Sequence, residues 1–358
     1  SRIKFIDNQM FEYGEPDERI EKLPVGIQQR VEILKILFRN AEILVFDEPT
    51  AVLTPQEVVE FFEIIKNLKK AGKAIIFITH KLHEVIEICD RINVLRRGEI
   101  VGEAFPKTTN NKELAELMVG RAVNLKTSRQ NIKMGNVLLE VDNLSILTNK
   151  NEPLVSNVDL KLHKNEILGI AGVQGNGQTE FIEALTGLRK VSSGKISYFG
   201  KQCKNFSPRK IHQLGVRHIP EDRQKQGLVG DFSLTENIIL NTYYEEKFSN
   251  NIALNWTNAK KEAKKIIEKF DVRTNSEDIS ADKLSGGNQQ KLLIGREMSR
   301  SINLLIASQP TRGVDVGSIE YIHNQIVEAR NNGIGVLLNS TELDEIIALS
   351  DRIIVFYE

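Results

Sequence analysis

Short apolar runs alternate along the chain with longer stretches in which apolar residues recur every three or four positions. The apolar runs that predict buried β-strands are 42–46 (EILVF), 74–78 (AIIFI), 166–172 (EILGIAG), 303–307 (NLLIA) and 335–339 (GVLLN). Two longer stretches, 28–40 and 54–72, have helical periodicity, and the second begins with Thr-Pro and ends with lysines and a glycine. Strands that alternate with helices predict a wound parallel sheet, so the expected fold class is α/β.

The chain contains an internal repeat with one ungapped offset. The segment LPVGIQQR (23–30) resembles LSGGNQQK (284–291), which gives an offset of 284 − 23 = 261 residues. The further matches at this offset are VFDEPT (45–50) with IASQPT (306–311), Gly72 with Gly333, LHEVI (82–86) with LDEII (343–347), and DRI (90–92) with DRI (351–353). Five matches in one register predict two copies of one domain rather than a solenoid.

The repeat also predicts where the copies begin and end. We assign residues 1–119 to the first copy, 120–136 to a polar linker without periodicity, and 137–358 to the second copy. A glycine-rich loop begins at Gly172, and its counterpart in the first copy would begin at 172 − 261 = −89, ahead of Ser1. We therefore expect a first copy that is truncated, in a chain that is part of a longer one.

Composition and charge favour some classes of function over others. Lys plus Arg and Asp plus Glu both number 48, and the resulting net charge of zero argues against a protein that coats nucleic acid. Cys89 and Cys203 lie in different halves of the chain and favour a reducing compartment over a disulfide framework. No apolar run approaches the roughly 18 residues that a membrane-spanning helix needs.

The segment GVQGNGQT (172–179) has the spacing of a phosphate-binding loop, Gly-x-x-x-x-Gly-Lys-Thr. It follows a predicted strand and precedes a helix-like segment, so backbone N–H groups would meet an anion at a helix N-terminus. Gln178 stands where the lysine that reaches the outer phosphates should be. The spacing alone is a weak signal, because a chain with 24 glycines contains such pairs by chance.

Several motifs in a fixed order strengthen this signal. The segments LSGGNQQK, LLIASQPTRGVD and ITH resemble the signature loop, the acidic strand end and the switch of nucleotide-binding subunits of ATP-binding-cassette (ABC) transporters. GIQQRVEILK, DEPTAVLTPQE, GVQGNGQTE and HIPEDRQKQGLV further resemble the tandem ATPases of bacterial simple-sugar and nucleoside importers. The resemblance covers nearly the whole chain. It implies tandem ABC-type P-loop ATPase domains, each with a mixed or parallel sheet core and a helical subdomain.

The resemblance implies one chemically intact site. Asp47 would orient Mg²⁺ and its waters, Glu48 would be the general base, and His80 would contact the γ-phosphate of ATP. In this family the two copies pair, and the signature of one copy completes the nucleotide site of the other. The nucleotide-binding residues that the second copy would supply are Ser285, Gly286, Gly287, Gln289 and Asp315.

The other site departs from the family pattern. Gln178 replaces the lysine, Ser308 the Mg²⁺ aspartate, Gln309 the catalytic glutamate, and Thr341 the switch histidine. The signature LPVG (23–26) and a threonine at position 54 add two further losses. Six losses on one site predict that it does not hydrolyse ATP. Whether nucleotide still binds is left open; the loop residues that would contact it are Gly172, Gly175, Asn176, Gly177, Gln178 and Thr179.

The resemblance implies an ATPase that powers import of a simple sugar or nucleoside. It would lie peripherally on the cytoplasmic face of the cell membrane and bind membrane permease subunits. An extracellular solute-binding protein would deliver the solute to these subunits. No contact with nucleic acid is expected. The 358 residues alone are expected to be inactive, because no phosphate loop precedes Glu48. Two alternatives stay open: a soluble ABC ATPase that acts on ribosomes or DNA, and a non-hydrolysing regulatory module.

Two further segments have competing interpretations. Residues 220–227 (PEDRQKQG) are either a solvated charged loop or, by the resemblance, the region that couples the nucleotide site to the permease subunits. His80 and His83 form an H-x-x-H pair, but no third ligand has the spacing of a metal site.

Overall fold

The computed structural model describes residues 19–20, 31–33, 35, 41–50, 53, 55–96, 98–122, 130–148, 150–173, 175–203, 206–250 and 253–357. The chain divides into two units, Ser1–Val123 and Asn124–Glu358, and the division falls inside the predicted linker at 120–136. The signature segment at 23–26, the threonine at 54 and most of the helix predicted at 28–40 lie outside the described residues.

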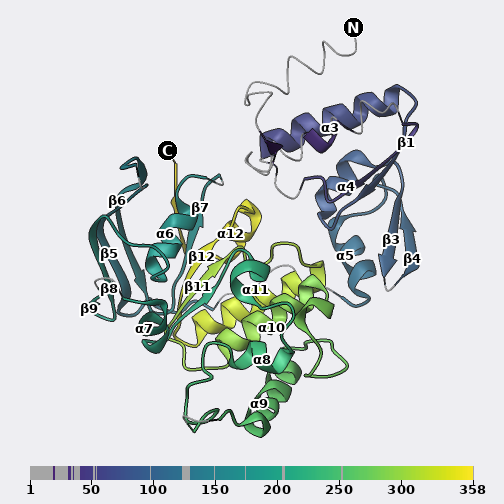
Figure 1. The fold of residues 1–358 in the computed structure, drawn as a ribbon. Helices are drawn as coiled ribbons and strands as arrows, with labels where there is room; N and C mark the ends of the chain where they lie inside the picture. The colour runs from purple at the N-terminus through teal and green to yellow at the C-terminus, as the bar shows by residue number, and fades with distance from the viewer. Residues whose placement is uncertain are drawn as a thin grey trace. The chain divides into compact units, whose positions relative to one another are not determined.

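The first unit contains a parallel and an antiparallel strand pair. Its described elements are β1 (Ile43–Asp47), α3 (Pro55–Lys70), β2 (Ala74–Ile78), α4 (Leu82–Ile88), β3 (Ile92–Arg96), β4 (Glu99–Ala104) and α5 (Asn111–Val119). Strands β1 and β2 pair in parallel, and β3 pairs with β4 antiparallel. Helix α3 connects β1 to β2, because parallel neighbours need a crossover connection (Figure 1).

The apolar stripe of α3 packs on one face of this strand pair. Phe61, Phe62 and Ile65 of α3 are buried together with Leu44 and Phe46 of β1. The rings of Phe46 and Phe61 meet edge to face, with centroids 5.6 Å apart. The packing therefore holds the carboxyl end of β1, where the candidate acids lie, against a rigid helix.

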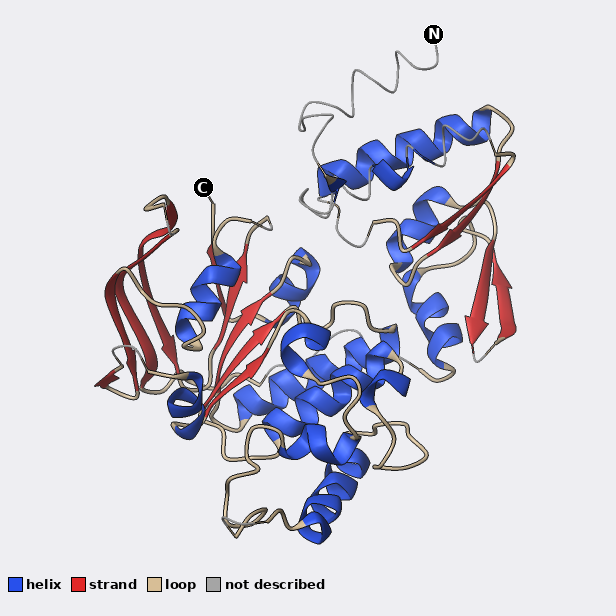
Figure 2. Ribbon diagram, in the orientation of Figure 1, coloured by secondary structure: helices blue, strands red, loops and turns tan. Residues whose placement is uncertain are grey.

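The second unit combines a parallel and an antiparallel sheet (Figure 2). Its strands are β5 (Val137–Leu147), β6 (Pro153–His163), β7 (Ile167–Ala171), β8 (Ser193–Tyr198), β9 (Lys201–Gln202), β10 (Val216–Ile219), β11 (Leu304–Ser308), β12 (Gly335–Asn339) and β13 (Arg352–Val355). The parallel sheet has the order β10-β11-β12-β7-β13, and the antiparallel sheet has the order β6-β5-β8-β9. Because the strand order differs from the chain order, helices must cross over the parallel sheet.

Helices cover both faces of the parallel sheet. The helical elements of this unit are α6 (Gln178–Leu185), α7 (Pro208–Gln213), η2 (Arg223–Gly227), α8 (Leu234–Ile239), α9 (Trp256–Lys269), η3 (Ala281–Lys283), α10 (Gly286–Met298), α11 (Val316–Asn331) and α12 (Leu343–Leu349). Helix α6 lies between the parallel and antiparallel sheets, and α10 and α11 lie on the other side of the parallel sheet (Figure 1).

Successive residues of the parallel strands enter two different cores. On β11, Leu305 and Ala307 join the core with α10 and α11, whereas Leu304 and Ile306 join the core with α6 and the antiparallel sheet. The side chains of a strand alternate between faces, so burial on both faces explains the continuous apolar runs of the sequence. The glycine-rich loop leaves this sheet at the carboxyl end of β7.

The elements of the two units coincide at the offset of the sequence repeat. Shifting β1, α3, β2 and α4 by 261 residues reproduces both bounds of β11, α11, β12 and α12. Gly72 and Gly333 end the equivalent helices with left-handed backbones, at φ 82° and 92°. The matched parts therefore have the same local succession of strand, helix and turn.

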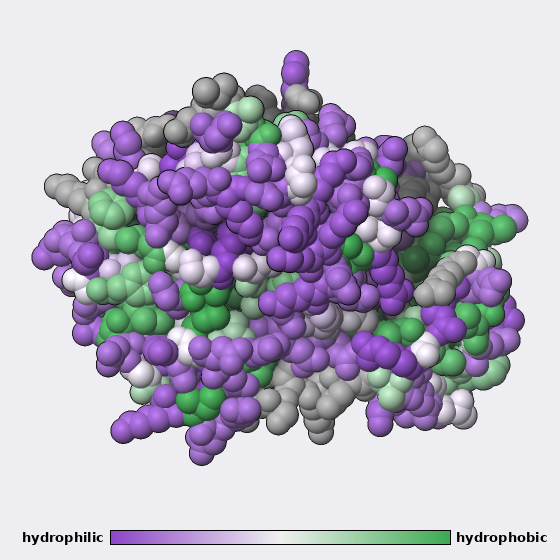
Figure 3. All heavy atoms as spheres, turned by 90° about the horizontal axis from the view of Figure 1, so that it is seen from below, coloured by the Kyte–Doolittle hydropathy of each residue, from purple (hydrophilic) through white to green (hydrophobic). Residues whose placement is uncertain are grey.

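The five strands predicted from apolar runs are all present, with ends shifted by no more than one residue. Within the described ranges, no helix is long and apolar enough to cross a membrane. The face drawn in Figure 3 is largely hydrophilic, and its hydrophobic residues form small separate patches.

Candidate functional site

The carboxyl end of β1 positions an acid against a histidine. Glu48 follows β1 and has a φ of 47°. A residue other than glycine keeps this left-handed backbone conformation only where the surrounding structure holds it in place. The N–H of Glu48 donates to the carbonyl of Ile78 at 2.9 Å. Its Oε1 accepts from the backbone N–H of His80 at 3.1 Å and lies 2.8 Å from His80 Nδ1. The predicted base and the predicted switch residue are therefore in direct contact.

The second unit repeats this arrangement with different chemistry. Gln309 has φ 49°, and its N–H donates to the carbonyl of Asn339 at 2.7 Å. Gln309 Oε1 accepts from the N–H of Thr341 at 3.2 Å and from Thr341 Oγ1 at 3.1 Å. The amide keeps the hydrogen bonds of the carboxylate, but it cannot accept a proton from water at neutral pH. The strand end of the second unit thus has the geometry of the first, with an amide in place of the carboxylate.

A buried glutamate anchors the loop that follows each strand. Glu84 Oε1 accepts from Thr50 Oγ1 at 2.6 Å, and Glu84 Oε2 accepts from Thr79 Oγ1 at 3.1 Å. In the second unit, Glu345 Oε1 accepts from Thr311 Oγ1 at 2.8 Å and lies 2.9 Å from His323 Nε2. These bonds tie the acidic turn to the helix that follows the switch, so the turn is fixed independently of any ligand.

The glycine-rich loop requires glycine at two of its positions. A Cβ at Gly177, whose φ is 88°, would lie 2.5 Å from the carbonyl oxygen of Leu154. A Cβ at Gly172 would lie 2.4 Å from Gln178 Nε2 and 2.6 Å from the carbonyl oxygen of Phe356. Gly175 faces open space, with no atom within 4 Å of a Cβ. The half-buried Asn176 lies between Gly175 and Gly177 and completes the described part of the turn into α6.

Gln178 is turned back onto the loop. Its side chain is buried, and Nε2 donates to the carbonyl of Val173 at 3.0 Å. The neutral amide therefore satisfies the loop backbone and brings no positive charge to a bound phosphate. Gln178, which stands in place of the expected lysine, is thus a well-packed side chain.

The next residue contacts an ion pair that the sequence did not predict. Thr179 Oγ1 donates to Glu221 Oε2 at 3.3 Å, and Arg312 Nη1 donates to Glu221 Oε1 at 2.7 Å. Glu221 belongs to the segment 220–227, and the ambiguous charge pattern of that segment was its only sequence signal. The contact joins residues 91 positions apart, so no local periodicity could reveal it.

The signature segment opens helix α10 next to the start of α11. A Cβ at Gly287 would lie 2.7 Å from Asp315 Oδ2, and a Cβ at Gly286 would lie 2.6 Å from Arg223 Nη2. Ser285 Oγ is exposed and accepts from Asn288 Nδ2 at 2.9 Å. Serine, glycines and aspartate are thus brought together, and the glycines allow the close approach.

Asp315 and Gln289 also have structural roles. Asp315 caps α11, where its Oδ1 accepts from the N–H of Ser318 at 3.0 Å. Gln289 is buried; its Nε2 donates to the carbonyl of Ala281 at 3.0 Å, and its Oε1 accepts from Arg223 Nε at 3.3 Å. A role of Gln289 in nucleotide binding stays a prediction.

The two strand ends differ as magnesium sites. Asp47 is exposed, and Glu48 Oε2 is buried without a hydrogen-bond partner in the described part of the chain. These carboxylate oxygens fit Mg²⁺, which prefers charged oxygen ligands. The corresponding Ser308 Oγ is also buried without a partner there, but it is neutral, as is Gln309. The strand end of the second unit therefore does not fit the ion.

The residues that the structure describes contain no group of three or more His, Cys, Asp or Glu side chains able to hold a metal ion. His80 contacts Glu48, and His83 is exposed. A magnesium ion at Asp47 would therefore depend on waters and on the nucleotide for its remaining ligands.

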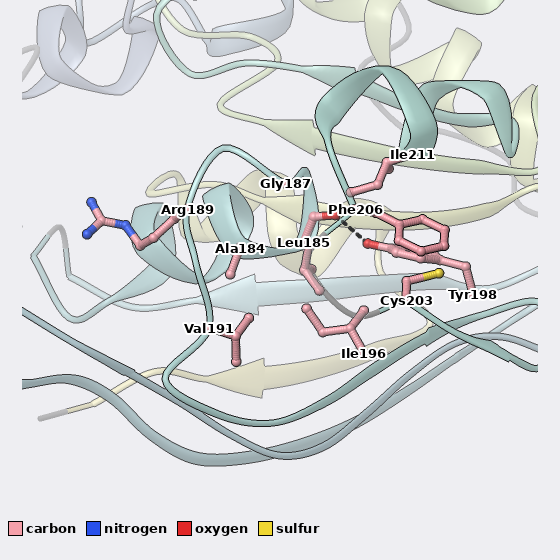
Figure 4. Close-up of a pocket in the computed structure, with 10 residues that line it drawn as sticks. All are labelled: Ala184, Leu185, Gly187, Arg189, Val191, Ile196, Tyr198, Cys203, Phe206 and Ile211. Carbon is pink, nitrogen blue, oxygen red and sulfur yellow. Dashed lines mark hydrogen bonds between the residues drawn. The ribbon is translucent and has the colours of Figure 1, made fainter.

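A small, partly open pocket lies beside the C-terminal end of α6 (Figure 4). Leu185, Ile196, Tyr198, Phe206 and Ile211 are among its lining residues. Its volume of about 30 Å³ is far too small for a nucleotide. The hydroxyl of Tyr198 donates to the carbonyl of Leu185 at 2.5 Å and closes the cavity against α6.

A glycine loop that leads from a buried parallel strand into a helix, beside a strand end followed by a buried turn, defines a P-loop nucleotide-binding protein. Residues 155–312 match the family model described as "ABC transporter". Because this match covers a single cassette and lies within the second unit, it does not bear on a tandem arrangement.

Two relatives match almost the whole chain. The nucleoside import ATP-binding protein NupA of Lactococcus lactis subsp. cremoris is 49% identical over 344 residues, which is 96% of this chain and 68% of the relative. The guanosine import ATP-binding protein NupO of Bacillus subtilis is 51% identical over 343 residues, 96% of this chain and 67% of the relative. The chain thus spans about two thirds of the length of these relatives.

Solved structures agree on the fold. A nucleotide-free ATP-binding cassette from an ABC transporter has a TM-score of 0.53 at 22% identity, covering 62% of this chain and 88% of that cassette. The chain belongs to the ATP-binding subunits of ABC transporters, a family of ATPases in which ATP hydrolysis is coupled to transport.

Proposed function

We propose that the chain contains two copies of an ABC ATPase unit that together power the import of a nucleoside or a simple sugar. The tandem arrangement is supported by the four element pairs that correspond at an offset of 261 residues. Import is supported by the relatives, whose names specify nucleoside and guanosine import and so favour a nucleoside. The protein would lie on the cytoplasmic face of the membrane, bound to permease subunits that receive solute from an extracellular binding protein.

The two units divide the chemistry. Glu48 acts as the general base for the water that attacks the γ-phosphate, and His80 orients the Glu48 carboxylate and contacts that phosphate. Asp47 holds Mg²⁺ through water, and the ion neutralises charge on the phosphates. The second unit binds nucleotide on its glycine loop and does not hydrolyse it. Hydrolysis in the first unit depends on the signature residues Ser285–Gly287 of the second.

One observation carries this division. Glu48 and Gln309 have the same strained backbone, at φ 47° and 49°, and each side chain accepts hydrogen bonds from the residue in the switch position. The two units therefore differ in the side chain at this position, a carboxylate in the first and an amide in the second. The local backbone structure is the same in both. A regulatory role explains a site that keeps its geometry without the base. Random decay would not be expected to preserve that geometry.

The test is Mg²⁺-dependent ATP hydrolysis by two proteins. The first is the 358-residue chain, and the second carries, ahead of Ser1, the residues that precede the matched region in the guanosine import ATP-binding protein of Bacillus subtilis. We expect no turnover from the first and clear turnover from the second, here named the extended chain. In the extended chain, Glu48→Gln should lower kcat at least 100-fold, because the general base is lost.

Matched variants in the second unit provide the control. Gln309→Ala removes the corresponding side chain and should lower kcat far less than Glu48→Gln does, and Gln178→Lys should not create turnover in the 358-residue chain. Turnover that survives Glu48→Gln would mean that the Gln178 site hydrolyses ATP, which would end the proposed division.

A further inference from the structure

The serine that opens helix α10 does not cap its own helix. An N-cap serine commonly accepts a hydrogen bond from a backbone N–H of the first helical turn. Ser285 is the N-cap residue of α10, but within the part of the chain that the structure describes its side chain makes no such bond. The exposed Ser285 Oγ instead accepts from Asn288 Nδ2 at 2.9 Å. A side-chain amide therefore takes the place of the helix backbone as the partner of this hydroxyl.

The other end of the Asn288 amide is held by the turn that follows helix α9. Asn288 Oδ1 accepts from the backbone N–H of Arg273 at 2.8 Å. Because a backbone N–H can only donate, the oxygen of the amide, and not its nitrogen, must face Arg273. The nitrogen then faces Ser285, and an –NH₂ group can only donate. The N–H of Arg273 therefore fixes which way round the amide lies.

The direction of these two bonds decides where the hydrogen of the Ser285 hydroxyl can point. A hydroxyl has one hydrogen to donate and two lone pairs that accept. Because Asn288 Nδ2 donates to one of the lone pairs, the hydroxyl hydrogen cannot be directed at that nitrogen and is available to an acceptor outside the helix. Phosphate oxygens are such acceptors. The amide thus makes the exposed hydroxyl a hydrogen-bond donor, which is the role that a phosphate requires.

The turn that presents the N–H of Arg273 is a closed helix end. Asp271 follows α9 with a left-handed backbone at φ 49°, and the N–H of Val272 donates back to the carbonyl of Ile267 at 2.9 Å. A left-handed residue followed by such a bond is the Schellman motif that ends many helices. Val272 is also buried in the core that contains α10. The donor to Asn288 therefore lies on a backbone segment that hydrogen bonds and packing both hold.

Helix α10 contacts the same turn at a second point. Lys291 Nζ donates to the carbonyl of Asp271 at 3.0 Å and to its carboxylate at 2.7 Å. The Lys291 side chain is 9% exposed, and its Nζ lies 5.1 Å from the ring centroid of Tyr321. The start of α10 and the end of α9 are thus joined by a buried cation as well as by Asn288. The orientation of the amide is therefore set by the fold before any ligand binds.

The first unit has neither the hydroxyl nor the amide. The offset of 261 places Pro24 opposite Ser285 and Ile27 opposite Asn288. In the proposed function the second unit's signature serves the site that hydrolyses ATP, and the first unit's signature serves the site that does not. The hydroxyl and the amide are therefore present together where hydrolysis needs them and absent together where it does not. This is the pattern expected if the amide acts on the hydroxyl.

We propose that Asn288 is a positioning residue for ATP hydrolysis at Glu48, because it fixes the Ser285 hydroxyl as a hydrogen-bond donor to the γ-phosphate. This inference rests on the proposed function, in which Ser285 of the second unit contacts the nucleotide of the first. Asn288 itself touches no phosphate in this role. A donor that is already oriented needs no reorganisation when negative charge develops on the γ-phosphate, so its effect belongs to kcat.

The experiment is a double-mutant cycle in the extended chain, read out as kcat of Mg²⁺-dependent ATP hydrolysis. Asn288→Ala, Ser285→Ala and the double variant are compared with the parent. We expect Asn288→Ala to lower kcat about fivefold, which is the loss of one oriented hydrogen bond. When Ser285 is already alanine, Asn288→Ala should change kcat less than about twofold, because no hydroxyl is left to orient. A distorted helix start would also displace Gly286 and Gly287 and would lower kcat in both backgrounds.

Two further variants test the direction of the bond and its location. Asn288→Asp keeps the size of the side chain and the bond to Arg273, but its second oxygen can only accept, so the Ser285 hydrogen would turn towards it. We expect kcat at least as low as in Asn288→Ala. Asn258→Ala is the control: it removes an exposed asparagine of α9 whose Nδ2 donates to the carbonyl of Lys247 at 3.1 Å, and it should turn over like the parent.

The other outcomes overturn the inference in distinguishable ways. Parent-like kcat in Asn288→Asp would show that the contact with Arg273 is sufficient. A loss in Asn288→Ala that persists beside Ser285→Ala would assign Asn288 to the helix fold or, with a raised KM for ATP, to direct contact with the nucleotide. Unchanged kcat in Asn288→Ala beside a lowered kcat in Ser285→Ala would leave the proposed function intact. No effect of Ser285→Ala, or no turnover in the extended chain, would reject the proposed dependence on the second unit together with the inference.

Discussion

Glu48 and Gln309 have the same backbone and the same pattern of hydrogen bonds, although one side chain is a carboxylate and the other an amide. A left-handed backbone at a residue other than glycine costs on the order of 1–3 kcal/mol, and both units retain it. Each side chain gains two contacts with the switch residue in return. The strain is therefore tied to the fold of the turn, and the exchange of carboxylate for amide changes reactivity with little change in shape.

The glycines of the loop provide a prediction at the same scale. Gly177→Ala would put a Cβ 2.5 Å from the carbonyl of Leu154 at φ 88°, so both strain and a clash oppose it. We expect it to lower the free energy of unfolding by about 2–4 kcal/mol in urea titrations. Gly175→Ala is the control: its φ is 102°, but nothing lies within 4 Å, so only strain of about 1 kcal/mol is expected. Equal losses in the two variants would contradict the close approach of the loop to the strand that contains Leu154.

Strand β10 of the parallel sheet contains His218, which is half-buried as a residue. His218 pairs with Ile306 of β11, and its Nε2 is buried without a hydrogen-bond partner among the described atoms. Burial lowers the pKa of His218 from its usual 6.5 to about 4. The neighbouring His212 has its pKa lowered to about 4 as well, first by burial and then by the charge of Arg217. Between the lowered pKa and the usual pKa, the two histidines are therefore neutral in the folded protein and protonated in the unfolded chain.

This linkage predicts the pH dependence of stability. Both folded pKa values lie below the unfolded value, so stability is complete above pH 6.5 and falls as the pH drops towards 4. Replacing the titrating ring in His218→Gln should remove about 2 kcal/mol of the stability lost between pH 7.5 and pH 5. Urea unfolding at several pH values measures it, with the exposed His83→Gln as control. Parallel pH curves for His218→Gln and the parent would show that this ring is not excluded from protons.

The elements differ in how well the sequence predicted them. Strands such as 74–78 and 335–339 were found because their residues form an uninterrupted apolar run, and helical periodicity predicted the helix at 54–72 that is observed as α3. The π-helical turn η2 was not predicted, because its residues 223–227 are all polar or glycine and have no apolar period. The contacts of Glu221 with Thr179 and Arg312 were missed for another reason: they join three segments that only the folded sheet brings together.

At the scale of the whole molecule, the two units are matched in elements and unequal in chemistry. Asp47, Glu48 and His80 lie in the first unit, and the phosphate-loop spacing of residues 172–179 lies in the second. The family resemblance suggests that neither unit works alone. If the two units depend on each other, a substitution in the second unit should change the rate of ATP hydrolysis, although the proposed base lies in the first unit.

Ser285→Ala in the extended chain tests this dependence. Ser285 lies in the second unit at the start of α10, with its hydroxyl exposed, whereas Glu48, the proposed base, lies in the first. Loss of one hydroxyl contact to a phosphate should lower kcat roughly 10–100-fold at saturating Mg²⁺ and ATP. Ser299→Ala, at the other end of the same helix, is the matched control and should leave kcat unchanged, because Ser299 Oγ donates only to the carbonyl of Gly295 in the described structure. If both variants turn over like the parent, hydrolysis at Glu48 does not depend on the second unit's signature, and the two copies act independently.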